Sequence, residues 1–180
     1  GVDIKGARLW KGAKYAEEHG LKNVGFVRTR IEFIESLFAP GEVSEIWITF
    51  ADPQIGREKK RLTAPLFMNR YRNFLKPGGI VHLKTDSRYL HEYSIAMARQ
   101  NDLKILAYGT DIYGEDREQL YASELSSVSG RSAIDALFEV QTFYESQYLA
   151  QGFPITYLAF LADHSGDYIS PEWAEDLWKD

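Results

Sequence analysis

The sequence predicts an α/β fold in which a mostly parallel sheet carries helices on both faces. Short apolar runs typical of buried strands alternate along the chain with segments whose apolar residues recur at helical spacing. Hydrophobic residues make up 44% of the 180 residues, which is enough for one sizeable core. The sequence contains no internal repeat and no low-complexity tract that would suggest another architecture.

The first strand–helix units are predicted within residues 1–75. Val2–Ile4 ends a strand, and Lys5–His19 forms a helix that Gly20 terminates, because glycine readily takes the positive φ found after helices. Asn23–Arg28 is predicted to be a short buried strand. The remaining elements of this part are a helix over Glu32–Phe38, a strand over Glu45–Phe50, a basic loop over Gln54–Arg61 and a helix over Thr63–Leu75 with Thr63 as its N-cap.

The next unit follows a predicted turn over Lys76–Gly79. Ile80–Thr85 is an apolar strand, and Asp86 or Ser87 caps a helix that runs to about Gln100. The later elements are a strand over Lys104–Tyr108, a short helix near Glu115–Leu125, a mobile serine-rich link over Ser126–Ser132, a helix over Ala133–Tyr148 with a break near Gln141, and a final strand over Ile155–Ala162.

Charge and composition divide the chain unevenly. Residues 1–162 are predicted to form one domain, and residues 163–180 an acidic extension with six acidic residues and one lysine, packed on the surface or on a partner. Residues 1–104 carry a net charge of +6 and residues 105–180 a net charge of −11, within a total of −5. The basic first half fits a working face for a polyanion, although an ordinary basic surface explains it equally well.

The composition also excludes several kinds of site. The absence of cysteine excludes a disulfide scaffold, a thiolate metal site and a cysteine nucleophile, and it fits a reducing cytoplasm. The four histidines lack metal-ligand spacing, so we expect no metal site. No apolar run approaches the roughly 20 residues of a membrane span. The chain opens with neither a signal peptide nor a methionine, which suggests a fragment or a processed form.

Three acidic residues each follow a predicted strand. Asp3, Asp52 and Asp86 stand at strand ends, where ligands bind in α/β sheets of this kind. Each could instead cap a helix or form a turn. Together they favour a ligand site at the carboxyl ends of the strands.

Two groups of motifs occur in a fixed order along the chain. The first group is Ala51-Asp52-Pro53-Gln54, Lys59-Lys60-Arg61, Leu75–Gly79 (Leu-Lys-Pro-Gly-Gly) and Thr85-Asp86. The second is Thr142-Phe143-Tyr144-Glu145, followed by Gly152. In order and approximate spacing they resemble the motifs of the tRNA (guanine-N7-)-methyltransferase family. The resemblance covers roughly residues 1–162 and leaves out the acidic extension.

The resemblance implies a Rossmann-like class I methyltransferase that uses S-adenosylmethionine (SAM). Such an enzyme transfers a methyl group to N7 of a guanine in the variable loop of tRNA, in the cytoplasm; we expect a monomer or a homodimer. Asp52 would act at the reacting centre and also contact SAM. The other implied SAM contacts are Asp3, Arg30 and Ile31. The implied substrate contacts are Lys59, Lys60, Arg61, Asp86, Thr142, Phe143, Tyr144 and Glu145.

Several of these residues also have a simpler interpretation. Thr142 and Glu145 have the Thr-x-x-Glu spacing of a helix capping box. Asp86 would cap the following helix, and the basic cluster Lys59–Arg61 would be a solvated loop. The tyrosines that would either stack on a flipped base or fill the core are Tyr113, Tyr121, Tyr144 and Tyr148.

The sequence departs from the family pattern in two respects. No glycine-rich SAM loop precedes Asp3, so we expect the first strand and that loop to belong to an upstream segment. Ala51 and Gln54 replace the family's proline and tryptophan, and Arg30 stands where an acid usually meets the adenine, with Glu32 as the substitute. The rival functions are a noncatalytic RNA-binding subunit with the same fold and a SAM methyltransferase that acts on another base nitrogen.

Overall fold

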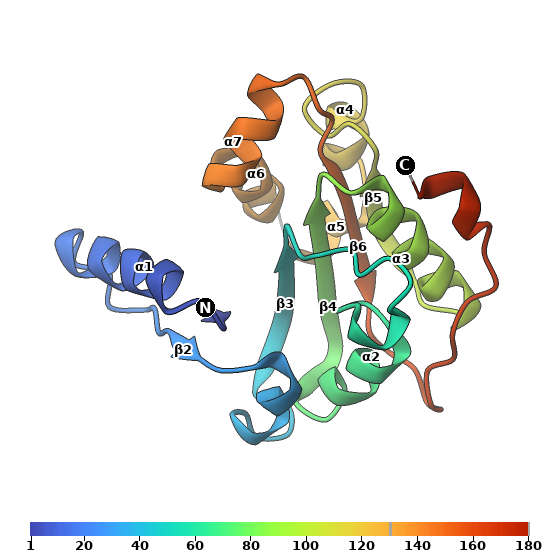
Figure 1. Ribbon diagram of the computed structural model, residues 1–180, viewed down its shortest axis with the longest axis horizontal. Helices are drawn as coiled ribbons and strands as arrows, with labels where there is room; N and C mark the ends of the chain where they lie inside the picture. Colours follow the sequence, from blue (N-terminus) through green and yellow to red (C-terminus); the bar gives the residue numbers. More distant parts are fainter. Residues whose placement is uncertain (130, 180) are drawn as a thin grey trace. The chain divides into compact units, whose positions relative to one another are not determined.

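The structure, a computed structural model, describes residues 1–129 and 131–179. The chain forms two compact units, a first unit of residues 1–39 and a second unit of residues 40–180. This division differs from the expected boundary after residue 162, because the acidic extension belongs to the second unit. Figure 1 shows the order of the elements along the chain.

The first unit is a strand–helix–strand segment. Its elements are β1 (Val2–Asp3), α1 (Gly6–Glu18), β2 (Val27–Arg28) and a 3₁₀ helix (Ile31–Ser36). β1 and β2 pair in parallel, and Gly20 follows α1 with a φ of 64°, as predicted. The prediction of a buried strand over Asn23–Arg28 is wrong, since only its last two residues pair and both are exposed. The predicted helix after it is a shorter 3₁₀ helix.

The second unit contains a four-stranded sheet. The strands in spatial order are β3 (Val43–Thr49), β4 (Leu75–Thr85), β6 (Thr156–Leu161) and β5 (Ile105–Gly109). β3 and β4 are parallel, whereas β6 is antiparallel to both β4 and β5. Three of the four strands therefore point in one direction, which agrees with the predicted mostly parallel sheet.

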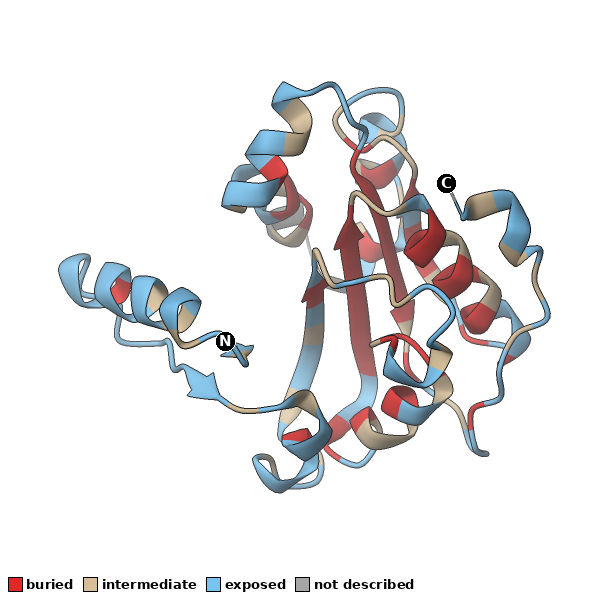
Figure 2. Cartoon of the chain, viewed as in Figure 1, coloured by how far each residue is buried: buried red, intermediate tan, exposed pale blue. Residues whose placement is uncertain are grey.

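Helices cover both faces of this sheet. Ile80 of β4 packs with apolar residues of α4 (Arg117–Tyr121), α5 (Glu124–Ser129) and α6 (Arg131–Glu139) in one core cluster. The next residue, Val81, is fully buried and points to the other face, since side chains alternate along a strand. The helices on that other side are α2 (Pro65–Tyr71) and α3 (Arg88–Gln100) (Figure 1). Figure 2 shows that β6 and the part of β4 after Gly79 are buried, while β3 is more exposed.

Two predicted caps and turns differ in detail. Thr63 does not cap α2: Ala64 is the N-cap, and the Thr63 hydroxyl hydrogen-bonds with that of Ser94 at 2.7 Å. The predicted turn over Lys76–Gly79 is an irregular part of β4, where the pairing register with β3 shifts. Gly79 is needed there because a Cβ would lie 2.8 Å from the carbonyl oxygen of Lys76.

The region predicted as a short helix and a mobile link is mostly helical. The single helix expected over Glu115–Leu125 is divided into α4 and α5, and the first part of the link continues α5, whose Leu125 is buried in the core. Gly130, also within the predicted link, lies outside the described residues. The break near Gln141 is confirmed, because α6 ends at Glu139 and α7 (Phe143–Ala150) begins after it.

The acidic extension packs on the surface of the second unit, which was one of the two predicted alternatives. Tyr168 is buried, and its backbone N–H donates to the side chain of Asn69. The ring of Trp173 meets Tyr89 and Tyr93 of α3 edge-on, with centroids 5.0 and 5.4 Å apart. A short 3₁₀ helix over Glu175–Trp178 follows. Across the described ranges, no helix combines the length and apolarity that crossing a membrane requires.

Candidate active site

The ends of β3 and β4 bring two of the predicted acids to one edge of the sheet, which we call the carboxyl edge. The two strands pair in parallel up to Thr49 and Lys84, and the N–H of Phe50 donates to the carbonyl oxygen of Lys84 at 2.9 Å. Asp52 and Asp86 follow just beyond this shared end. Parallel pairing therefore places them at the same edge, although 33 residues lie between them in the sequence.

Asp52 lies in a turn with an unusual backbone. Phe50 and Gln54, which bound this Asp52 turn, have φ values of 50° and 51°, a region that residues other than glycine rarely adopt. Asp52 is exposed, and its Oδ1 accepts a hydrogen bond from the N–H of Gln54 at 2.9 Å. That bond leaves most acceptor positions of the carboxylate free for a ligand. Backbone strain of this kind is concentrated at functional sites.

Arg61 supports this turn from inside the protein. It is 2% exposed, and its guanidinium donates to the carbonyl oxygens of Pro53 at 2.9 Å and Gln54 at 3.2 Å. A third hydrogen bond, of 2.7 Å, goes to the hydroxyl of Tyr89. The structure thus contradicts the predicted phosphate contact of Arg61, because a buried guanidinium with these partners does not face tRNA.

The rest of the basic cluster is on the surface. Lys59 and Lys60 are exposed in a short 3₁₀ helix over Glu58–Lys60, and Arg57 is exposed just before it. This segment follows the Asp52 turn along the chain. A phosphate contact by these three side chains stays a prediction.

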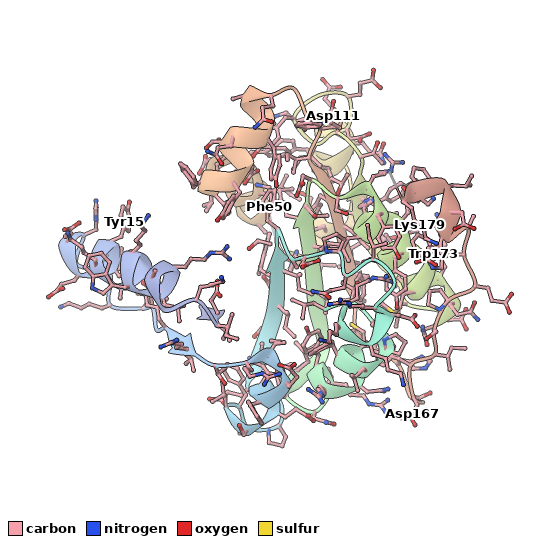
Figure 3. The ribbon with its side chains drawn as sticks, viewed as in Figure 1. Tyr15, Phe50, Asp111, Asp167, Trp173 and Lys179 are labelled. Carbon is pink, nitrogen blue, oxygen red and sulfur yellow. The ribbon has the colours of Figure 1, made fainter. Side chains whose placement is uncertain are left out.

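Asp86 lies near Tyr148 of α7. The negative charge of Asp86 raises the pKa of the Tyr148 hydroxyl above its ordinary value, and burial and a hydrogen bond between the two groups add to the rise. Tyr148 also stacks against Phe50, with ring centroids 6.2 Å apart, and Figure 3 shows Phe50 at the end of β3 toward α7. Asp86 is not the N-cap of α3, which was its simpler interpretation. Ser87 caps this helix, since its hydroxyl accepts a 3.2 Å hydrogen bond from the N–H of Leu90.

Thr142 and Glu145 form a capping box at the start of α7. The N–H of Glu145 donates to the Thr142 hydroxyl and the N–H of Thr142 donates to the Glu145 carboxylate, each at 3.1 Å. Glu145 is fully buried, with Lys84 Nζ 2.5 Å from its Oε1, to which the Tyr113 hydroxyl donates at 2.7 Å. The structure thus supports the capping interpretation, and Glu145 holds α7 where the sequence predicted a guanine contact.

Lys84 is the main residue that the sequence reasoning missed. Its ammonium group is buried at the end of β4 and also donates to the carbonyl oxygen of Leu137 at 2.6 Å. Burial lowers the pKa of Lys84, and the hydrogen bond and charge of Glu145 oppose that change. A signal was present, since a lysine within the apolar strand Ile80–Thr85 requires an internal partner.

Exposed aromatic rings lie on the segment that also carries Tyr148. They are contributed by α7 and the loop that follows it, and they suit the stacking of a base. The rings concerned are Phe143, Tyr144 and Phe153.

The predicted SAM contacts are divided between the two units. Asp3, at the end of β1, accepts a hydrogen bond from the N–H of Lys5 at 2.8 Å and lies 3.5 Å from Arg8. Its carboxylate keeps acceptor positions that suit the two hydroxyls of a ribose. Arg30 pairs with Glu32 at 3.3 Å, so the two residues considered for adenine contact bind each other. Because Asp52 belongs to the second unit, a joint SAM site stays a prediction.

The histidines have structural partners. The buried His82 stacks on Trp47 with centroids 3.9 Å apart and hydrogen-bonds with the Tyr157 hydroxyl at 2.7 Å. In the part of the chain that the structure describes, no three His, Asp or Glu side chains are grouped so as to hold a metal ion.

Comparison with known proteins adds independent information. Residues 1–123 match a family model described as "Putative methyltransferase". A tRNA (guanine-N7-)-methyltransferase of Christiangramia forsetii is 51% identical over 162 residues, which cover 89% of this chain and 66% of that protein. One of Bacteroides thetaiotaomicron is 43% identical over 171 residues, which cover 95% of this chain and 62% of that protein. The chain therefore spans less than two thirds of the length of these curated relatives.

A solved structure supports the fold. The [4+2]-cyclase SpnF superposes with a TM-score of 0.51 at 17% sequence identity, covering 92% of this chain and 66% of that chain. The Rossmann-like fold of class I methyltransferases that the sequence predicted is confirmed. Because the family model matches more than half of its length and these relatives are 43% and 51% identical over the aligned residues, the chain belongs to the tRNA (guanine-N7-)-methyltransferase family.

Proposed function

We propose that the protein containing this chain transfers a methyl group from SAM to N7 of a guanine in the variable loop of tRNA. The observation that carries the proposal is the carboxyl edge of the second unit. There the exposed carboxylate of Asp52, the carboxylate of Asp86 and the rings of α7 are grouped at the ends of neighbouring parallel strands. The names of the relatives agree with this chemistry.

Methyl transfer to guanine N7 requires that the protein position the base and stabilise its developing charge; it requires neither a general base nor a metal ion. Guanine N7 has an in-plane lone pair, so the new N7–carbon bond can form as the sulfur–carbon bond breaks, without a proton transfer. SAM supplies the methyl group as a sulfonium. The product base carries a positive charge, and the free carboxylate oxygens of Asp52 would stabilise that charge as it develops.

Asp86 would select the base. A carboxylate accepts hydrogen bonds from N1–H and the N2 amino group of guanine, which adenine cannot offer in the same arrangement. Asp86 lies near Tyr148, whose ring is packed on Phe50. The guanine would have to leave its stack to reach this edge, and Phe143 and Tyr144 offer exposed rings on which it could rest.

The remaining contacts involve the cofactor and the tRNA backbone. Asp3 would hold the SAM ribose, with Arg30 and Ile31 beside the adenine, and Thr142 would act through the start of α7. Lys59 and Lys60 would hold phosphates. We place this activity in the cytoplasm, in a monomer or a homodimer.

Labelled methyl transfer tests the proposal directly. The product of the complete gene would be incubated with labelled SAM and unmodified tRNA, and the tRNA digested to nucleosides. We expect label in 7-methylguanosine alone. Label in another nucleoside would replace the proposal by an enzyme acting on a different nitrogen. Absence of label, with tRNA bound and no saturable heat in a SAM titration, would replace it by an RNA-binding subunit.

A further inference from the structure

A continuous series of contacts joins the acidic extension to the Asp52 turn. Arg61 donates to the carbonyl oxygens of Pro53 and Gln54 within the turn. The same guanidinium donates to the hydroxyl of Tyr89, and that hydroxyl donates to the carboxylate of Glu175. Each hydrogen bond in this series has one donor and one acceptor, because the Tyr89 hydroxyl accepts from Arg61 and donates to Glu175.

Aromatic packing reinforces the same series. The Arg61 guanidinium lies over the ring of Tyr93, 4.0 Å from its centroid, and the Tyr93 hydroxyl donates to Glu58 at 2.7 Å. Trp173 of the acidic extension covers both Tyr89 and Tyr93 edge-on, on the side of the extension that faces α3 (Figure 3). The two tyrosines are therefore held between the arginine and the extension.

The Asp52 turn needs such support. Its two residues with positive φ, Phe50 and Gln54, are not glycine, so the turn is strained and persists only if its surroundings fix it. Two of its carbonyl oxygens are fixed by a single guanidinium. A buried guanidinium in turn requires partners for its donors and a compensating charge. Glu175 supplies a negative charge through Tyr89, and the hydrogen bond from Tyr89 lowers the pKa of Glu175, which favours its ionised form.

We propose that Glu175 and Trp173 are positioning residues for Asp52, so that the acidic extension holds the reacting carboxylate in place through Tyr89 and Arg61. This inference rests on the proposed methyl transfer. It gives a function to a segment that lies outside the sequence motifs of the family. None of these residues touches a substrate: each acts through the conformation of the Asp52 turn.

The test compares Glu175→Ala with Glu172→Ala in the product of the complete gene. Both changes remove one acidic side chain from the same segment, but Glu172 is exposed and is not part of the series. We expect kcat at saturating SAM and tRNA to fall about fivefold in Glu175→Ala, the effect of losing one hydrogen bond, and to be unchanged in Glu172→Ala. Glu175→Gln, which still accepts from Tyr89, should restore most of kcat.

A double variant tests the route. In Tyr89→Phe the ring stays but the hydroxyl that links Arg61 and Glu175 is lost, so adding Glu175→Ala should cause no further fall in kcat. Additive losses would show that Glu175 acts by another route and would overturn the proposal. Equal kcat in the wild type and Glu175→Ala, with only a lower melting temperature, would reduce the extension to a stabilising segment and would also overturn it.

Hydrogen exchange separates this proposal from the proposed function. The N–H groups of Gln54 and Arg57 are bonded within or next to the turn. We expect both to exchange faster in Glu175→Ala than in Glu172→Ala. If this difference appears but the wild type methylates no tRNA, the support of the turn stands and the proposed reaction fails. If the exchange rates of the two variants agree, the extension does not hold the turn.

Discussion

At the residue scale, the most consequential contact is the buried pair of Lys84 and Glu145. The two side chains are 4% and 0% exposed, and they join the end of β4 to the start of α7. A buried ion pair is weak evidence for added stability, but removing one partner leaves an uncompensated charge in the interior. The pair therefore fixes where α7 begins, and with it the position of Thr142 and of the aromatic rings beside Asp86.

Glu145→Gln isolates the charge of this pair. Glutamine keeps the capping box, because its amide oxygen still accepts from the N–H of Thr142, but it leaves Lys84 without a counter-charge. We expect the free energy of unfolding, measured in urea, to fall by about 3 kcal/mol. Adding Lys84→Met should recover most of that loss. A double variant no more stable than Glu145→Gln would contradict the importance of the charge pair.

The residues themselves show how far sequence reasoning reaches. Asp52 and Asp86 were found because each follows an apolar strand, and parallel pairing then places them together. The partners of Arg61 could not be found in this way. Arg61 is buried because it binds Tyr89 and packs on Tyr93. Tyr89 lies 28 residues further along the chain, and only the packing of α3 brings these tyrosines close to Arg61.

At the element scale, the acidic extension behaves as part of the second unit. Its Tyr168 is buried, and Ile169 exchanges two hydrogen bonds with the side chain of Asn101 at the end of α3. Beyond these contacts, Glu175 is bonded to Tyr89 of the same helix. The extension is thus attached to α3 along its length.

The attachment should depend on pH through Glu175. The hydrogen bond from Tyr89 is the largest cause of the lowered pKa of Glu175, so its stabilising contribution is present above the unfolded value of 4.5 and is lost as pH falls through the folded pKa. We expect the wild type to melt at a higher temperature than Glu175→Gln near pH 6, and the difference to shrink as the pH falls below 4.5 and through the folded pKa. A difference that is constant over this range would show that the carboxylate charge contributes nothing.

Most elements were predictable, and the exceptions have physical causes. Strands such as β3 and β4 follow from apolar runs, and the capping box at Thr142 follows from its spacing. The position of Thr63 before Pro65 predicts a helix cap, but its hydroxyl is hydrogen-bonded to that of Ser94 in α3. The apolar residues of Asn23–Arg28 predict a longer buried strand than β2, because apolar character alone does not show that both residues of β2 are exposed. The antiparallel direction of β6 is a property of how the strands are paired, which apolar periodicity does not report.

At the scale of the whole molecule, charge is the feature that bears on tRNA. The total of −5 hides a basic first half, and the exposed lysines of the cluster follow directly after the Asp52 turn. Each phosphate neutralised by such a lysine releases counterions, which makes binding depend on salt. The sequence predicts a basic surface formed by Lys59, Lys60 and Arg61. In the structure Arg61 is buried, so only the two lysines of this cluster are on the surface.

The salt dependence of tRNA binding tests that surface. Lys59→Gln and Lys60→Gln should each reduce the slope of log K against log salt by about 0.7–0.9. Lys76→Gln is the matched control, because Lys76 is exposed at the beginning of β4, away from the carboxyl edge. Equal changes in all three variants would show a diffuse attraction rather than a phosphate site at this edge.

The central claim is that Asp52 provides the charge that methyl transfer needs, and Asp52→Asn tests it most directly. Asparagine can keep the bond from the N–H of Gln54, so the turn is retained while the charge is lost. Asp163→Asn is the control, since Asp163 accepts a similar bond from Gly78 near the start of β4. The measurement is kcat for formation of 7-methylguanosine in tRNA by the product of the complete gene. We predict a fall of about 100- to 1000-fold in Asp52→Asn, an unchanged kcat in Asp163→Asn and similar melting temperatures for both. Full activity in Asp52→Asn would contradict the account.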